Sequence, residues 1–266
     1  MRLITIPVII LVIFIILSIA TPVLLLEGIE GLLPADVREN TSGMRENFAL
    51  LLSDISSVFG RYDTCVDLYD YLISRFPAKS DYYGKKALNL QKLGRLEETI
   101  TTLDMALALE PEDINYLLRK ARLSKALYRN DESDRTYKQI NQLTPKNAIE
   151  YALSGDASLD QGKYTRALEM YTESLARDPE NSLVWEKRGD VIFALLTIPT
   201  AGLPADQNLK SQDLFAEGTK SYENAIRLNP EKALDIKLKM SKKSDVFIPQ
   251  SIAELESRYT HYRYLG

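Results

Sequence analysis

The stretch YALSGDASLDQGKYTRALEMYTESLARDP, residues 151–179, decides the predicted fold. Gly162 divides it into two helical segments, because glycine supplies the left-handed backbone that ends a helix. Pro179 limits the second segment, because proline cannot continue the helical hydrogen-bond ladder. The stretch therefore predicts a helical hairpin.

The same hairpin recurs along the chain. Pro77, Pro111, Pro145 and Pro179 follow one another at intervals of 34 residues. With the proline counted as position 32, small residues recur at positions 8 and 20 and mostly bulky ones at position 24. Small residues let two helices cross closely, and the bulky residue fills the space beside them. The recurring residues are Ser53, Ala87, Ala121 and Gly155 at position 8, Cys65, Thr99, Ser133 and Ala167 at position 20, and Tyr69, Leu103, Tyr137 and Tyr171 at position 24.

A fifth copy opens with Trp185 and ends at Pro230. It carries an insertion between its helices near residues 197–212, which contains Pro199, Gly202 and Pro204 and is predicted as a surface loop. Residues 231–266 show helical spacing again and are predicted as C-terminal capping helices, which a solenoid needs to cover its last apolar face.

On these residues the chain resembles the tetratricopeptide-repeat (TPR) family over about residues 46–230. The resemblance implies an all-α, right-handed superhelical solenoid of about five hairpins spanning residues 44–230, with repeats ending near Pro77, Pro111, Pro145, Pro179 and Pro230. It also implies a concave groove, lined by the first helices at positions 2, 5, 9 and 12, that binds a peptide or a partner domain.

The N-terminal segment predicts one transmembrane helix. Residues 3–26 carry no charge, and a helix of that length reaches about 36 Å, enough to cross a hydrocarbon core of roughly 30 Å. Residues 1–26 are therefore predicted as a single-pass anchor, and residues 27–43 as a linker broken by glycine and proline. Arg2 precedes the span and acids follow it, which favours an extracytoplasmic TPR domain. A cleaved secretory signal, with Ser18-Ile19-Ala20 as the site, stays open, and a buried core helix fits less well.

Composition argues against several functions. A formal net charge of −4 gives no basic field for nucleic acid. The single cysteine, Cys65, lies at a small packing position, and the single histidine, His261, has no second histidine for a metal site. The chain also lacks a phosphate-binding glycine loop. We therefore expect no enzyme activity, no cofactor, no metal and no small-molecule substrate.

The candidate binding residues lie at the groove positions that the resemblance implies. They are Asn115, Leu118, Arg119, Arg122 and Lys125 of the third hairpin and Asp156 of the fourth. The cations form a stripe that could pair with carboxylates of an acidic segment or a free C-terminus. The alternative is a solvated helix face whose charges neighbouring acids balance. The Lys, Asn and Arg set with which some TPR domains clamp a terminal carboxylate is not reproduced.

Together these features predict a membrane-anchored scaffold that binds a partner protein in the TPR groove. The alternative is a cell-envelope assembly or secretion factor that binds extracytoplasmic polymers or secreted chains.

Overall fold

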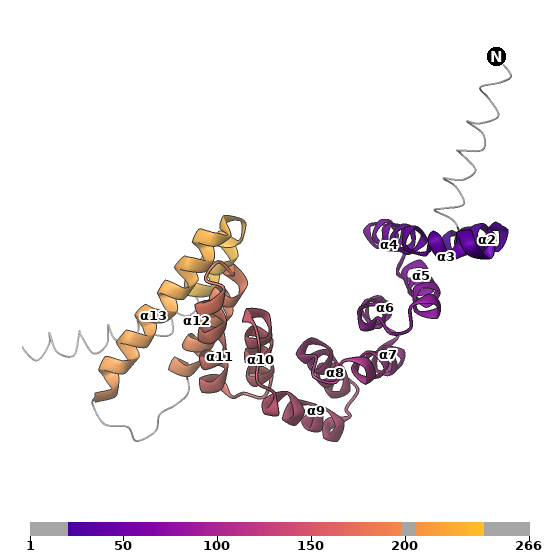
Figure 1. Cartoon of the computed structure of the whole chain (residues 1–266). Coiled ribbons are helices and arrows are strands. Elements are labelled where there is room, and N and C mark those ends of the chain that lie inside the picture. The colour runs from indigo at the N-terminus through magenta and orange to yellow at the C-terminus, as the bar shows by residue number, and fades with distance from the viewer. Residues whose placement is uncertain (1–20, 198–205, 242–266) are drawn as a thin grey trace, which may run out of the picture. The chain divides into compact units, whose positions relative to one another are not determined.

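The computed structural model describes residues 21–197 and 206–241, and every regular element in those ranges is a helix (Figure 1). The chain divides into two compact units after Lys138, within α9. The first unit contains α2 (Pro22–Leu32), α3 (Ala35–Asn40), α4 (Ser42–Val58), α5 (Tyr62–Arg75), α6 (Ser80–Lys92), α7 (Leu96–Leu109), α8 (Ile114–Ala126) and most of α9 (Asn130–Gln142). The second contains α10 (Ala148–Asp160), α11 (Tyr164–Arg177), α12 (Ser182–Thr197), α13 (Asp206–Leu228) and a short 3₁₀ turn, Pro230–Lys232. The all-α prediction is confirmed.

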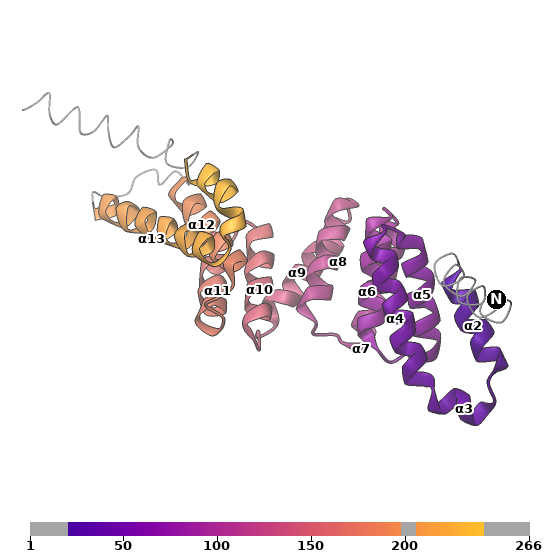
Figure 2. The ribbon, with the colours of Figure 1, turned by 90° about the horizontal axis from the view of Figure 1, so that it is seen from above.

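The helices pair into the predicted hairpins. The first helices α6, α8, α10 and α12 begin at Ser80, Ile114, Ala148 and Ser182, so their starts keep the interval of the repeat prolines. Figure 2 shows α4 to α7 of the first unit side by side. Within each unit the hairpins also pack on one another, α6 on α5 and α8 on α7 in the first unit and α12 on α11 in the second.

Left-handed residues end the first helices of four hairpins. Gly60, Gly94 and Gly162 have φ of 69°, 74° and 71°, as the sequence predicts. The third hairpin has Tyr128 at the equivalent place, with φ 59° and its ring exposed. At each turn the next amide donates to a carbonyl five residues back, as Arg129 does to Ser124 at 2.8 Å, which is the Schellman pattern.

The small positions bring the two helices of each hairpin together. A methyl group on Gly155 would lie 2.6 Å from Cε1 of Tyr171, so this pair fits only with glycine at position 8. Where position 20 is polar, it can bond back to the backbone at position 8: the Cys65 thiol donates to the Ser53 carbonyl at 3.3 Å, and the Ser133 hydroxyl to the Ala121 carbonyl at 2.9 Å. Size and one local hydrogen bond therefore fix the crossing.

The predicted linker, residues 27–43, is largely helical in the structure, so its assignment as an irregular tether needs correction. It spans the end of α2, all of α3 and the start of α4. Gly28 and Gly31 are tolerated because α2 packs Leu26 into the core of the first hairpin and Glu30 pairs with Arg75 at 2.8 Å. Packing of this kind outweighs a helix penalty of about 1 kcal/mol for each glycine.

The predicted membrane span falls mostly outside the described residues, since residues 1–20 are not among them. Within the described part of the chain, no helix is long and apolar enough to cross a membrane. The last residues of the apolar run belong to α2, where Pro22 and Leu26 are buried. The boundary predicted at residue 26 therefore lies inside a helix packed on protein.

The C-terminal part differs from the predicted boundaries at one place. The loop predicted for residues 197–212 is shorter, because α13 begins at Asp206, and residues 198–205 lie outside the described ranges. Residues 233–241 are helical and bury Ile236 against Phe193, Tyr222 and Ala225 at the end of the fifth hairpin. The rest of the predicted cap, residues 242–266, is not described.

Candidate functional site

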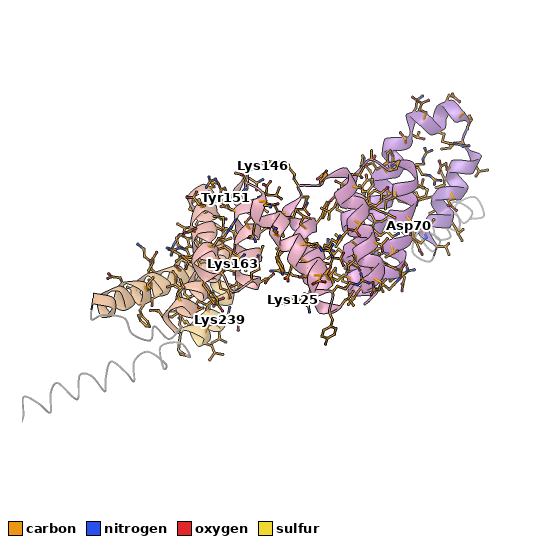
Figure 3. All side chains as sticks on the ribbon, turned by 90° about the horizontal axis from the view of Figure 1, so that it is seen from below. Asp70, Lys125, Lys146, Tyr151, Lys163 and Lys239 are labelled. Atoms are coloured by element: carbon orange, nitrogen blue, oxygen red, sulfur yellow. The ribbon has the colours of Figure 1, made fainter. Side chains whose placement is uncertain are left out.

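The basic stripe predicted for the third hairpin lies on α8. Asn115, Arg122 and Lys125 are exposed, with Lys125 in the last turn of the helix (Figure 3). Leu118 is almost wholly buried, so it belongs to the core instead of a binding surface. Five of the six candidate residues therefore share one helix, and four of these five are at least partly accessible.

Arg119 links α8 to the first helix of the preceding hairpin. Its guanidinium donates to the Gly84 carbonyl at 3.1 Å and to Oε1 of Gln91 at 3.5 Å, both on α6. Gly84 allows this approach, because a methyl group there would lie 2.5 Å from the ring of Tyr116 on α8. Gly84 and Gln91 lie seven residues apart on one face of α6, and the Gln91 side chain reaches the guanidinium that also bonds to the Gly84 carbonyl.

Arg119 has no carboxylate partner in the part of the chain that the structure describes. Both of its hydrogen-bond acceptors are neutral, and the second bond is long. The group is half-buried, and this burial lowers its pKa because desolvation disfavours the charged form. A cation placed this way gains more from an incoming anion than an exposed cation would.

The second unit contains a cation at the equivalent position that does contact a carboxylate. Lys187, at position 6 of the fifth hairpin, donates to both carboxylate oxygens of Asp156, at position 9 of the fourth, at 2.7 Å each. In the second hairpin position 9 is Leu88, which lies between Gly84 and Gln91 on the α6 face and is 45% exposed. Arg119 is at position 6 of the next hairpin. Leu88 therefore stands at the place relative to Arg119 that Asp156 has relative to Lys187.

Asp156 itself is not available as a groove ligand. It is 7% exposed, and its Oδ1 also accepts the Tyr171 hydroxyl at 2.7 Å. In the fifth hairpin, Asp190 likewise accepts the Tyr222 hydroxyl at 2.6 Å. The carboxylate at position 9 therefore holds a buried tyrosine in the last two hairpins, and Asp156 belongs to the second unit whereas the α8 stripe belongs to the first.

We define the α6–α8 face as Lys85, Leu88, Gln91, Arg119 and Lys125. Lys85 pairs with Asp81 at 2.9 Å across one helical turn, whereas Lys125 forms no ion pair within the described residues. The face thus combines one exposed leucine with two cations that form no ion pair among the described residues, although Asp113 acts on Arg119 at longer range. The sequence alone allows the residue at position 6 of each hairpin to be compared with the residue at position 9 of the preceding hairpin. That comparison would have identified Arg119 as a cation with a leucine at the preceding position 9.

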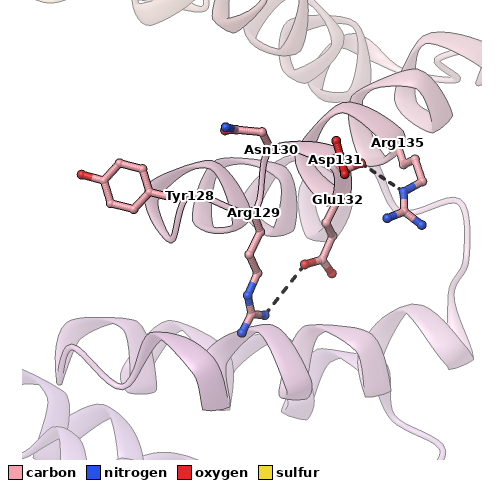
Figure 4. Close-up of a pocket in the computed structure, with 6 residues that line it drawn as sticks. All are labelled: Tyr128, Arg129, Asn130, Asp131, Glu132 and Arg135. Atoms are coloured by element: carbon pink, nitrogen blue, oxygen red, sulfur yellow. Dashed lines mark hydrogen bonds and ion pairs between the residues drawn. The ribbon is translucent and has the colours of Figure 1, made fainter.

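A hollow at the start of α9 is lined by Tyr128, Arg129, Asn130, Asp131, Glu132 and Arg135 (Figure 4). Arg129 pairs there with Glu132 at 3.8 Å and with Glu97, and Arg135 donates to the Asp131 backbone carbonyl at 3.1 Å. No buried charge points into it. We therefore do not assign it a ligand.

The residues that could support catalysis or metal binding are arranged for packing. Burial raises the pKa of the Cys65 thiol, which disfavours the reactive thiolate. No group of three or more metal-ligating side chains occurs among the residues described. His261 lies outside them.

Known proteins match both the sequence and the arrangement of helices. Residues 151–181, the fourth hairpin, match the family model of the tetratricopeptide repeat. The fourth hairpin is therefore similar in sequence to a TPR. An Hsp70-Hsp90 organizing protein of Triticum aestivum is 24% identical over 184 residues, covering 63% of this chain. The match spans 31% of that relative, so this chain corresponds to about a third of it.

Solved TPR structures resemble the chain in fold. A thermophilic TPR protein of Thermus thermophilus, TTC0263, gives a TM-score of 0.52 at 17% identity, over 74% of this chain and 98% of that one. A human IFIT1 dimer with m7Gppp-AAAA gives 0.53 at 11% identity, over 79% and 53%. These likenesses support a TPR-like solenoid and, at such identities, show the fold alone. TPR proteins mediate protein–protein interactions.

Proposed function

We propose that the chain is a non-catalytic scaffold that binds an acidic segment of a partner protein on the α6–α8 face. The observation that carries the proposal is Arg119, a half-buried guanidinium with neutral hydrogen-bond partners only. A carboxylate of a bound segment would supply the charge that Asp156 supplies to Lys187 elsewhere in this chain. Charge-assisted pairs of this kind are roughly twice as strong as neutral hydrogen bonds.

The face indicates the pattern of the ligand. Arg119 and Lys125 are six residues apart on α8, which places them about 9 Å apart along the helix axis and about 120° apart around it, so a segment that reaches both crosses the helix obliquely. An extended peptide covers that distance in about three residues, so two acids separated by two or three positions would reach both cations. Leu88 offers an apolar contact beside Arg119, which suits a segment with a hydrophobic residue between its acids.

Site-specific photo-crosslinking tests the proposal. A photoreactive amino acid replaces Leu88 in the full-length chain, and products are identified from native cells. We expect one stoichiometric protein product that falls at least about tenfold with Arg119→Gln or Lys125→Glu, a loss of about 1.4 kcal/mol. The matched control is Lys138→Glu, an exposed charge reversal on α9. A product insensitive to both α8 substitutions would reject this face, and a heterogeneous mixture of products would favour the envelope-factor alternative.

A protein ligand is favoured over nucleic acid because the net charge of −4 provides no general attraction to phosphates. The TPR-like structure of human IFIT1 with m7Gppp-AAAA nevertheless shows that fold alone does not select the ligand class. Fluorescence anisotropy with a capped RNA probe at physiological salt distinguishes the two. We expect no saturable binding, and saturable binding lost with Arg119→Gln would reassign the ligand.

We further propose that the chain is attached to a membrane through its N-terminal apolar run, with the TPR domain outside the cytoplasm. Since α2 begins at Pro22, residues 3–21 would form the span, about 28 Å of helix against a core of roughly 30 Å. Alkaline extraction and protease protection of the full-length chain test this. Release into the soluble fraction, with or without N-terminal cleavage, would contradict a permanent anchor.

A further inference from the structure

Neighbouring hairpins within each unit share an apolar core. Residues at positions 17, 21 and 28 of a second helix pack with residues at positions 3, 10 and 14 of the next first helix. These residues are Leu96, Ile100 and Leu107 of α7 with Tyr116, Leu123 and Leu127 of α8, and Tyr164, Leu168 and Leu175 of α11 with Val184, Val191 and Leu195 of α12. In a repeat array, such contacts between neighbours couple the hairpins into one cooperative unit.

The same positions carry polar or small residues where the third hairpin is followed by the fourth. They are Asn130, Asp134 and Asn141 of α9 and Glu150, Ala157 and Gln161 of α10. Asn130 and Asp134 are exposed. A polar outer face is typical of the terminal, capping repeat of an array, because that face meets water instead of another repeat. α9 therefore has the character of the end of an array, although a further hairpin follows it.

The start of α10 has the character of the beginning of an array. The Glu150 amide donates to Oδ1 of Asn147 at 3.0 Å, and the Glu150 carboxylate accepts from the Asn147 side-chain amide at 2.7 Å and from the Lys146 amide at 2.8 Å. This reciprocal arrangement is a capping box, which satisfies backbone donors at the start of the helix. Position 3 of α10 thus serves its own helix, whereas the residues at that position in the second, third and fifth hairpins are buried.

A polar bond between neighbouring hairpins follows the same division. In the other hairpins that follow a repeat, a cation at position 7 bonds to position 25 of the preceding hairpin. These bonds are Lys86 to Asp70 and Lys120 to Asp104, at 2.6 Å each, and Arg188 to Thr172 at 3.2 Å. The fourth hairpin has Ser154 at position 7, and the third has Lys138 at position 25, so this pair of residues cannot form an ion pair. The buried Ser154 hydroxyl has no hydrogen-bond partner among the residues described.

We propose that the junction between the third and fourth hairpins is a hinge, so that the two units fold independently and reorient relative to one another. The division of the chain into compact units falls there, after Lys138. At the end of α9, the Asn141 side chain donates to Gln161 and its carbonyl accepts from Arg166, at 3.0 Å each. Water can replace bonds of such partly exposed groups at a small net cost. The hinge does not depend on where a partner binds.

Hydrogen exchange of the full-length chain, measured by mass spectrometry, tests the independence of the units. Leu103→Ala truncates a fully buried side chain of α7 and should speed amide exchange in α6, α7 and α8 at least about tenfold, because these helices share a core. Exchange in α11 and α12 should remain as in the wild type, even if the first unit unfolds completely. Leu175→Ala on α11 is the reciprocal variant and should affect α12 but not α6 to α8. Spread of either effect into the other unit would overturn the proposal.

Distances between paired spin labels test the reorientation. One pair joins Thr101 on α7 to Glu169 on α11, and the control pair joins Thr101 to Asp67 on α5, all at exposed positions. Noncanonical residues carry the labels, so the buried Cys65 stays unmodified. We expect the distance distribution between the units to be at least about twice as wide as the distribution within the first unit. Equal widths would show a rigid junction and overturn the proposal.

Restoring the apolar residues of the other junctions tests the cause. Asn141→Leu combined with Gln161→Leu should narrow the distribution between the units and let the effect of the α7 truncation spread into α11 and α12. Asp235→Leu, an exposed polar-to-apolar change away from α9 and α10, is the matched control and should leave both measurements unchanged. A restored junction that behaves as the wild type does would contradict the assignment of the hinge to these residues.

Discussion

Replacing Asp156 with alanine is expected to destabilise the second unit by about 3 kcal/mol. The Tyr171 hydroxyl donates to the carboxylate at 2.7 Å, and a hydrogen bond to a charged acceptor contributes about 1.5–3 kcal/mol. The ion pair with Lys187, whose side chain is 28% exposed, adds no more than about 1 kcal/mol once solvent screening is considered. Alanine also leaves the buried Tyr171 hydroxyl without this acceptor.

Tryptophan fluorescence during urea unfolding measures this effect selectively. Trp185 is the single tryptophan of the chain, and it packs in the core of the second unit beside Tyr171. With a denaturant slope of about 1–3 kcal/mol/M, the midpoint for Asp156→Ala should fall by roughly 1–3 M. Asp156→Asn keeps an oxygen for Tyr171, so it should cost about 1 kcal/mol.

The control is Asp235→Ala, which removes an exposed carboxylate of the same unit and should shift stability by no more than about 0.5 kcal/mol. The reasoning is refuted if Asp156→Ala unfolds at the wild-type midpoint. If that variant also lost partner capture, Asp156 would be a ligand-binding residue, as the repeat positions alone suggest.

Three further predictions concern stability. Hydrogen bonds from Lys79 and from a tyrosine hydroxyl lower the pKa of the Glu46 carboxyl. The stabilisation that Glu46 gives to the folded chain is therefore present above the ordinary carboxyl pKa and is lost as the pH falls through the lowered folded value. Urea titrations at acid pH should show a smaller loss of stability for Glu46→Gln than for the wild type. Tyr128→Gly should stabilise the chain by about 0.5–1 kcal/mol, because glycine removes the backbone strain of a tyrosine in the left-handed conformation. Urea unfolding followed by circular dichroism should show a higher midpoint, and a lower midpoint would contradict that strain. Gly155→Ala should destabilise the folded chain by about 1–2 kcal/mol, because overpacking against the Tyr171 ring outweighs the helix propensity gained. A variant as stable as the wild type would show that the ring moves freely.

The repeat period predicted the hairpins well because their boundaries depend on local chemistry. Proline and left-handed glycine act within one or two turns, so the starts of α6, α8, α10 and α12 follow from the sequence alone. The α2–α3 region was wrongly predicted as irregular, because α2 depends on the burial of Leu26 against α4 and α5, while α3 buries no side chain and follows α2 at the surface. Composition cannot show such a tertiary contact.

The candidate site was less predictable, because repeat positions specify where a residue lies on its helix and not what faces it. The α8 cations are partly or fully exposed, as a binding face requires, but Leu118 is in the core and Asp156 is held by Tyr171 and Lys187. What distinguishes Arg119 is the leucine at position 9 of the preceding hairpin, and only a comparison between neighbouring repeats shows that difference.

The bond from Lys187 to Asp156 crosses from one hairpin to the next, so it also limits how these hairpins could be duplicated or recombined. A copy of the fourth hairpin keeps its aspartate compensated only when the following hairpin has an available cation at position 6; the second has Lys85 there, but Lys85 pairs with Asp81 of its own helix. Placed before the first hairpin, which has Leu51 there, the same aspartate would lose its cation. The hairpins are therefore similar in shape but not freely interchangeable, and a chimaeric array has to keep neighbours together.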